Sequence, residues 1–128
     1  MDAEVFVEPA VGIALIGVTG NDAGRIVRAN RALATLLART LEELTGRVLC
    51  EFIHTEDRDR ALAEFTRIVG RARGSCEGEG RLLVKDGGVR WVRVHAGLMP
   101  HEGDARAMVM LHISQIAERS EQRAASAG

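Results

Sequence analysis

The four histidines are the residues of this 128-residue sequence best suited to hold a metal ion. They are His54, His95, His101 and His112, and no two of them have the close spacing of ligands in a zinc site. His54 precedes a predicted helix, where a capping or hydrogen-bonding role is favoured. His95 and His112 fall on predicted strands, and His101 falls in a turn. The sequence therefore predicts no metal site.

Patterns of catalytic residues are equally weak. Ser75 and Ser114 lack a nucleophile signature, and neither TGNDAG nor KDGG has the Gly-x-x-x-x-Gly-Lys pattern of a phosphate-binding loop. The rival enzyme hypothesis is a cone-shaped α+β fold of the ketosteroid-isomerase kind, which needs a buried strand carboxylate and a phenol or protonated acid as its partner. The sequence has no Tyr, and the predicted inward strand faces hold no Asp or Glu. We therefore expect no enzymatic activity.

Composition limits the partners and the compartment. The formal net charge is -1, with one Trp, three Phe and no Tyr, whereas nucleic-acid binding needs a basic face and stacking aromatics. The N-terminal MDAEVFVEPAVGIALIGV has acids where a signal peptide has bases, and its apolar run is too short to span a membrane. We expect a cytoplasmic protein with no nucleic-acid or membrane partner. Cys50 and Cys76 are expected as reduced, buried side chains rather than as a disulfide.

A change of periodicity marks the first helix. The apolar runs at 12–18 (GIALIGV) and 24–29 (GRIVRA) are typical of strands that flank a Gly-rich turn. From Asn30 onward the apolar residues, among them Leu33 and Leu37, have the spacing of one helix face. The side chain of Asn30 can accept from the free amides of a first helical turn, so Asn30 is predicted to end the strand and cap the helix.

Three further helical segments are predicted before the chain returns to strands. Thr40 and Glu43 have the spacing of a capping box, and LCEFI (49–53) suits a single helical turn. Thr55 is predicted to cap a longer helix that ends at Gly70. The predicted apolar face of this helix consists of Ala61, Leu62, Phe65, Ile68 and Val69.

The second half of the sequence alternates as antiparallel strands do. The predicted strands span 76–85, 89–99 and 106–113, and KDGG (85–88) is a strong hairpin signal between the first two. The order of elements is therefore two strands, several short helices and three antiparallel strands.

Six segments of the sequence, taken in this order, resemble a PAS sensor domain over about residues 11–119. They are GIALIGV, GRIVRAN, LEELTGR, FIHTEDRDRAL, KDGGVRWVRV and MLHIS. The resemblance implies an α+β fold with a five-stranded antiparallel sheet and short helices packed on one face. We expect a flanking segment at 1–10, the PAS domain at 11–114 and a helical linker or tail at 115–128. Two positions depart from the family: Thr55 stands where a Pro is frequent, and 112–114 reads His-Ile-Ser instead of Asp-Ile-Thr.

The resemblance implies a sensory module that binds a small ligand or dimerises, and that relays a signal to an effector in a longer protein. Such an effector would be a histidine kinase of a two-component system or a cyclic-nucleotide enzyme. Haem-binding members generally take an axial His from the long helix, and DRDRALAEFTRIV contains none. Light-sensing flavin members carry Asn-Cys-Arg on a helix, which VLCEFI does not match, and a chromophore thioester at Cys50 or Cys76 would lack its usual phenolic partner. No cofactor is therefore expected.

Two alternatives remain open for the space between sheet and helices: a cavity for a largely apolar ligand, or a filled core in a module that only dimerises. Gly78 and Gly80 on the inward face could leave room, although glycines in strands also mark bulges. The lining of such a cavity is predicted to be Leu33, Leu37, Phe52, Phe65, Val92, Val94, Val109 and Leu111.

Trp91 is predicted on the outer face of the sheet, beside Arg93 and His95. A Trp among charged side chains is a large apolar area to leave in water. Either the N-terminal segment with Phe6 covers it, or a second copy of the chain does. The resemblance favours a homodimer, with Trp91 and Ile116 near the centre of the interface and Phe6 as part of it.

Overall fold

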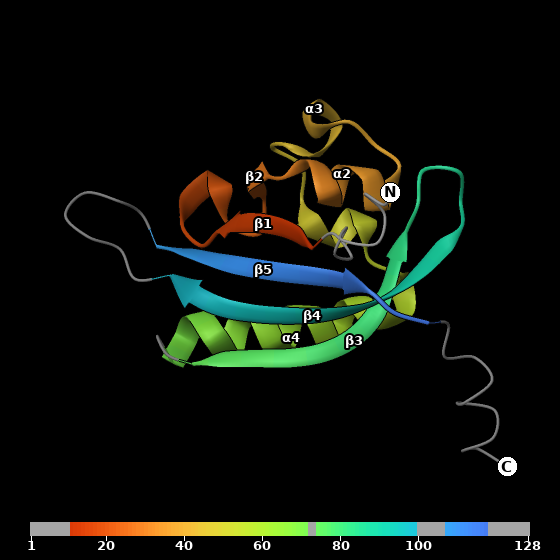
Figure 1. Ribbon diagram of the computed structural model, residues 1–128. Helices are drawn as coiled ribbons and strands as arrows, with labels where there is room; N and C mark the ends of the chain where they lie inside the picture. Colours follow the sequence, from red (N-terminus) through yellow and green to blue (C-terminus); the bar gives the residue numbers. More distant parts are fainter. Residues whose placement is uncertain (1–10, 72–73, 100–106, 118–128) are drawn as a thin grey trace, which may run out of the picture.

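The computed structural model describes residues 11–71, 74–99 and 107–117. Within these residues five strands form one antiparallel sheet, in the order β2-β1-β5-β4-β3, and the helices pack on one face of it (Figure 1). The α+β architecture that the resemblance implied is confirmed. The strands are β1 (Gly12–Gly17), β2 (Ile26–Ala29), β3 (Ser75–Leu83), β4 (Val89–Met99) and β5 (Met108–Gln115).

Short helical segments join β2 to β3 and cover the sheet. Helix α2 packs against β1, and α4 runs along β3 and β4 (Figure 1). The segments are the α-helices α2 (Arg31–Leu37), α3 (Leu41–Leu44) and α4 (Thr55–Arg71) and the 3₁₀ helix η2 (Leu49–Phe52). A further 3₁₀ helix, η1 (Gly20–Asp22), lies between β1 and β2.

Asn30 joins β2, α2 and β1 at one point. Its Oδ1 accepts from the amide of Leu33 at 3.0 Å, which is the predicted helix cap, and also from the amide of Ile13 at 2.9 Å. Its Nδ2 donates to the carbonyl of Val11 at 3.0 Å, and its own amide donates to the carbonyl of Ile13 at 3.0 Å. The predicted junction without a loop is confirmed, and one side chain satisfies backbone groups of two elements at once.

Of the three other predicted helix caps, those at Thr40 and His54 are confirmed and the one at Thr55 is wrong. Thr40 and Glu43 form the capping box, each side chain accepting from the other's amide, at 3.1 and 2.9 Å. Thr55 is not a cap, because it is already the first residue of α4. His54 takes this position: its Nδ1 accepts from the amide of Glu56 at 3.1 Å, so the predicted capping role of His54 is confirmed.

The core lies between the helices and the inward face of the sheet, and two predicted details of its edges need correction. Leu62 is 55% exposed, so its predicted place on the apolar face of α4 is wrong. α4 contacts the sheet through a narrower stripe, in which Ile68 is buried and Phe65 half-buried. The last strand ends at Gln115 rather than at residue 113, so the sheet extends one residue past the expected domain boundary. Residues 1–10 and 118–128 lie outside the described residues.

Asp57 is the one charged residue that is buried in the described part of the chain, where it is 5% exposed. Its Oδ2 accepts from the backbone amide of Arg81 at 2.9 Å and from Arg81 Nε at 3.1 Å, while its Oδ1 accepts from Arg81 Nη2 at 2.9 Å. The amide of His54 donates to the carbonyl of Arg81 at 3.0 Å. These four bonds fix the first turn of α4 to the free edge of β3.

The carboxyl group of Asp57 is charged although it is buried. Burial by itself would raise the pKa of this carboxyl, but the hydrogen bonds and positive charge of Arg81, helped by Arg60, outweigh it. The pKa of Asp57 therefore lies below its ordinary value, and the carboxylate stays ionised at neutral pH.

We predict that Asn30→Ala destabilises the chain by about 2 kcal/mol, the upper end of the range for losing a helix cap, because the amide of Ile13 loses its partner as well. Asn30→Asp keeps the acceptor oxygen and should restore most of this loss. Urea unfolding monitored by circular dichroism measures both changes. An unchanged unfolding midpoint in Asn30→Ala would contradict the junction.

We predict that Asp57→Asn lowers the free energy of unfolding at neutral pH by about 1.5–3 kcal/mol, the range for hydrogen bonds to charged groups. Because the pKa of Asp57 is depressed in the folded chain, its contribution is present above the unfolded pKa of about 4 and is lost as pH falls below it. The variant should therefore lose less stability on acidification than the wild type. Asp59→Asn, an exposed acid on the same helix, is the control and should behave as wild type. Equal acid sensitivity of wild type and Asp57→Asn would refute the ionised pair.

Candidate functional site: a cavity between α4 and the sheet

A cavity of about 250 Å³ lies between α4 and the inward faces of β3, β4 and β5. Its wall is almost entirely apolar, because the inward positions of β4 and β5 carry aliphatic side chains and α4 adds aliphatic and aromatic ones. The apolar lining residues are Leu49, Ile53, Ala61, Phe65, Ile68, Leu82, Val92, Val94, Ala96, Val109, Leu111 and Ile113.

Two glycines of β3 leave the space open on the side of α4. Gly78 and Gly80 pair with Val94 and Val92 and share their inward face. A Cβ at Gly78 would meet no atom within 4 Å, and one at Gly80 would lie 3.6 Å from Asp57 Oδ2, an ordinary contact. Any other residue at 78 would therefore extend into free space between β3 and α4. The space between β3 and α4 is open because the two glycines have no side chains. A bulge is not the cause, since the register of β3 with β4 is regular through both positions.

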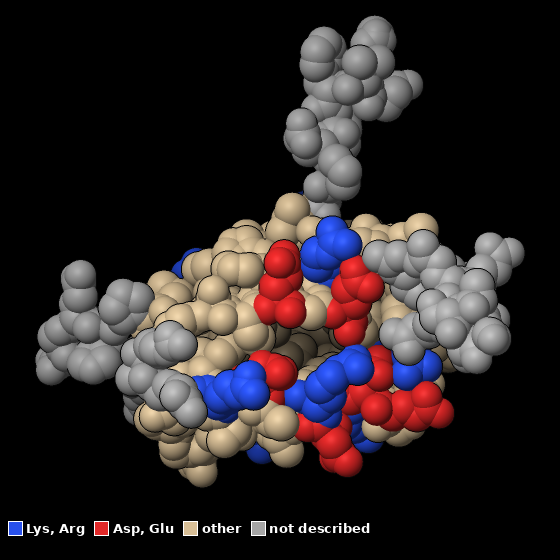
Figure 2. All heavy atoms as spheres, turned by 90° about the horizontal axis from the view of Figure 1, so that it is seen from below, with Lys and Arg blue, Asp and Glu red and all other residues tan. Residues whose placement is uncertain are grey.

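Charged side chains surround the mouth of the cavity. Figure 2 shows a hollow whose border carries residues of both signs. From α4, Arg60 donates to the carbonyl of Glu79 at 3.1 Å and pairs with Asp57 at 3.4 Å. Glu64 of α4 also lines the cavity. An apolar interior with a charged border admits a molecule whose body is apolar and whose polar end stays at the surface.

Cys76 also lies in the wall of the cavity, near Glu64 of α4. Burial raises the pKa of the Cys76 thiol, and the negative charge of Glu64 raises it further. The thiol is therefore protonated at neutral pH and is a weak nucleophile. Cys50 and Cys76 are free cysteines, and both are half-buried rather than buried as predicted.

The structure brings five of the eight predicted lining residues together and leaves three apart. Phe65, Val92, Val94, Val109 and Leu111 line the cavity. Leu33, Leu37 and Phe52 are buried in the core instead, outside the cavity wall.

Gly78 and Gly80 of β3 were predicted from the sequence, whereas Cys76, Leu82 and the charged border of the cavity were not. Cys76 and Leu82 follow from the alternation that placed Gly78 and Gly80 inward, so this signal was available. Asp57 and Arg60 could not be found in this way, because their position depends on how α4 lies across the sheet.

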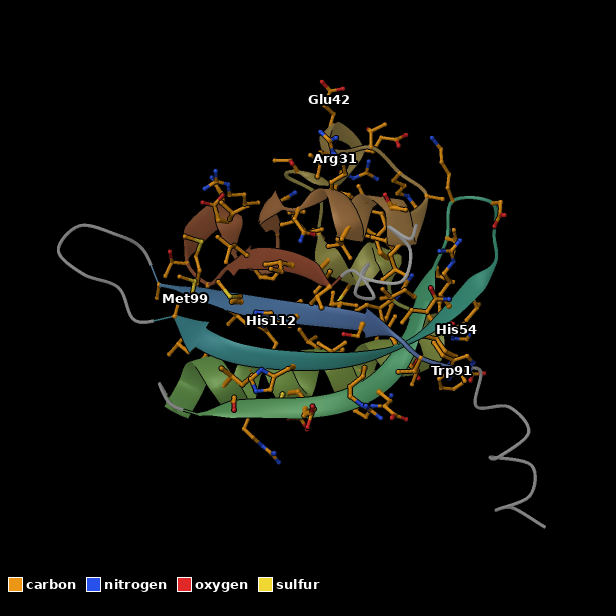
Figure 3. All side chains as sticks on the ribbon, viewed as in Figure 1. Arg31, Glu42, His54, Trp91, Met99 and His112 are labelled. Atoms are coloured by element: carbon orange, nitrogen blue, oxygen red, sulfur yellow. The ribbon has the colours of Figure 1, made fainter. Side chains whose placement is uncertain are left out.

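Trp91 is buried in the single chain, at 8% exposure. The guanidinium of Arg81 lies over its ring, 5.2 Å from the ring centre, and its carbonyl accepts from the amide of Ile116 at 2.9 Å. Trp91 lies at the end of the sheet where the chain leaves β5 (Figure 3). The dimer interface was predicted because Trp91 was expected to expose a large apolar area to solvent, and Trp91 does not do so. The dimer itself stays a prediction. Ile116 is half-buried, and Phe6 lies outside the described residues.

Two of the histidines meet through the register of the sheet. His95 on β4 is directly opposite His112 on β5, with 6.2 Å between the ring centres. The spacing along the chain gave no sign of this pair. Among the described residues no group of three or more His, Cys, Asp or Glu is placed to hold a metal ion. In the same part of the chain, no helix combines the length and the apolarity that a membrane crossing requires.

Comparisons with solved structures show the same fold. A PAS domain from Colwellia psychrerythraea aligns with a TM-score of 0.71 and 21% identity, over 83% of this chain and 86% of that one. The PAS-B domain of Drosophila melanogaster Cycle, with bound ethylene glycol, aligns with a TM-score of 0.71 and 11% identity, over 82% and 99%. A light-oxygen-voltage domain studied with a flavin analogue has a TM-score of 0.69 and 16% identity, over 90% and 84%. At these identities the likeness concerns the fold alone.

No curated protein is similar enough to the chain to count as a match. The family model described as the PAS fold matches residues 13–116, from β1 to the residue after β5. That match covers most of the chain and agrees with the order of its strands and helices. The chain therefore belongs to the PAS family, whose members are sensory and signalling modules.

Proposed function

We propose that this PAS domain is a ligand sensor that binds a small, largely apolar molecule in the cavity between α4 and the sheet. The observation that carries the proposal is an apolar cavity of about 250 Å³ kept open by Gly78 and Gly80. Drug-sized ligands occupy pockets of about 300–1,000 Å³, so the ligand proposed here is smaller. No catalytic step is assigned to the site.

The apolar wall and the charged border set the expected chemistry of the ligand. Burying an apolar surface in such a wall stabilises the complex by about 25 cal/mol per Å². A charged group deep in the cavity would lose its water without a partner, because the wall offers it almost no polar atoms. A polar end would therefore be held near Arg60 and Glu64 at the mouth.

The signal would leave through the contacts that start at the cavity border. Asp57 lines the cavity and holds Arg81, whose guanidinium lies over Trp91, and the carbonyl of Trp91 accepts from Ile116 just after β5. An effector in a longer parent protein, such as a histidine kinase or a cyclic-nucleotide enzyme, would read a change at this end of the sheet. We place the domain in the cytoplasm and assign it no haem, flavin or metal cofactor in the cavity.

We also propose a homodimer through the outer face of the sheet, which leaves the pure dimerisation module as the alternative function. Apolar side chains of β1, β4 and β5 lie on that face and are half-buried, in a sheet whose other face carries all the helices. Such a face is exposed to water unless a partner covers it. The side chains are those of Ile13, Leu15, Met99, Met108 and Met110.

We predict that a leucine at position 78 abolishes ligand binding without unfolding the chain, because its side chain enters the free space at the cavity mouth. In a Cys50→Ala background, the rate at which N-ethylmaleimide alkylates Cys76 reports on the cavity. Indole is a suitably small apolar probe and should slow this reaction in the parent. In Gly78→Leu, the affinity for indole should fall by at least about tenfold, or about 1.4 kcal/mol.

Gly97→Leu is the matched control, since Gly97 lies on the opposite, outer face of β4. It should bind indole as the parent does. Indole that protects Cys76 equally in Gly78→Leu, or that never protects it, would exclude the cavity as the binding site. Mass spectrometry of small molecules released from freshly purified, denatured protein would then identify the natural ligand.

We predict that the chain sediments as a dimer at micromolar concentration and that Met110→Glu makes it a monomer, because a carboxylate would be buried in an apolar contact. Trp91→Glu is unsuitable, because Trp91 is buried in each chain and its replacement would unfold the protein. Leu62→Glu places the same charge on the exposed side of α4 and should stay dimeric. A monomeric wild type would exclude the dimer, and a dimeric Met110→Glu would place the interface elsewhere.

A further inference from the structure

His95 and His112 form an exposed pair on the outer face of the sheet, on the side opposite the cavity. They occupy directly opposed positions of the antiparallel strands β4 and β5. The ring centres are 6.2 Å apart, and the ring planes are inclined by 53°. Figure 3 shows His112 midway along β5, away from both ends of the sheet. The pair therefore lies within the sheet, where the register between β4 and β5 has no shift.

The spacing of the pair suits one metal ion between the two rings. Opposed residues of an antiparallel pair have Cβ atoms about 4.5–5.5 Å apart. A ring nitrogen binds zinc at about 2.0–2.1 Å, which puts the ring centre about 3 Å from the ion. Two rings bound to one ion therefore have centres up to about 6 Å apart. The observed separation of 6.2 Å is just beyond that limit, so small side-chain rotations must bring the rings closer for both to bind one ion.

The charges around the pair favour a cation. Glu77 on β3 is directly opposite His95, so a carboxylate, two imidazoles and three adjacent strands form one row. Arg93, the nearest base along β4 on the same face, is held by Glu79 at 2.9 Å. The positive charge of Arg93 is thereby offset, whereas Glu77 adds negative charge beside the rings.

We propose that His95 and His112 together bind a divalent transition-metal ion of the zinc, nickel or copper type, with water completing the coordination. Imidazole nitrogens suit these ions, whereas magnesium and calcium require oxygen ligands. The described residues provide no third ligand in place, so the site is open and its affinity is moderate. The ion would bridge β4 and β5 and would stabilise the folded chain by mass action.

The test is a titration of the full chain with zinc chloride in a buffer free of chelators, measured by calorimetry. We expect one ion per chain. His95→Gln and His112→Gln should each lower the affinity by at least about tenfold. His101→Gln removes a histidine that is not part of the pair and should bind zinc as wild type does. Because the pair shares its face with the proposed dimer contact, the titration is repeated in Met110→Glu, where binding should persist.

A second measurement is independent of the variants. Copper(II) added to the wild type should give an electron paramagnetic resonance spectrum with two coordinated nitrogens, and EDTA should remove it. The melting temperature should rise with zinc in the wild type but not in His95→Gln. Absence of zinc binding, wild-type affinity in either variant of the pair, or an equal loss in His101→Gln would overturn the proposal.

Discussion

The ion pair between Asp57 and Arg81 is the interaction on which the placement of α4 depends. A buried carboxylate is unfavourable by itself, and only its three bonds to Arg81 make the arrangement stable. One of these bonds is donated by a backbone amide of β3. The carboxylate therefore fixes where α4 lies along β3 as well as the distance between α4 and β3. Glu56 adds an exposed contact to the same guanidinium at 3.2 Å. Beyond the first turn, Arg60 also donates to the carbonyl of Glu79, and the other contacts of α4 with the sheet are mainly apolar.

The cavity is a direct result of this anchoring. α4 is fixed at its first turn, and beyond that turn β3 presents Gly78 and Gly80 where other strands present aliphatic side chains. Helix and strand are therefore held close at one end, while farther along β3 has no side chains at positions 78 and 80 to fill the space between them. A larger residue at position 78 would fill the space without strain, because a Cβ there has no neighbour within 4 Å. The open cavity thus depends on two absent side chains as much as on the twelve apolar residues of its wall.

Features governed by neighbours in the sequence could be predicted, and those governed by distant contacts could not. The cap at Asn30, the capping box at Thr40 and the hairpin at 85–88 each follow from a few adjacent residues. Alternation along β4 placed Val92 and Val94 in the cavity wall. Leu33, Leu37 and Phe52 were wrongly grouped with them, because periodicity identifies a buried face without saying what that face touches. The burial of Trp91 beneath Arg81 and the pairing of His95 with His112 depend on strand register, which the chain between β4 and β5 does not reveal.

The same ion pair connects the two faces of the sheet. Arg81 donates to Asp57 on the helix side and lies over Trp91, whose carbonyl binds the amide of Ile116. In the family, an Asp just before the end of the last strand often fixes the start of the output helix, and His112 occupies that position here. The contact between Trp91 and Ile116 offers a different attachment, four residues beyond His112 along the chain. A ligand that displaces the first turn of α4 would strain the bonds of Asp57 to Arg81 and shift the guanidinium over Trp91. The contacts between the cavity border and the end of β5 need no carboxylate at position 112, because they consist of a cation–aromatic contact and a hydrogen bond to a backbone carbonyl.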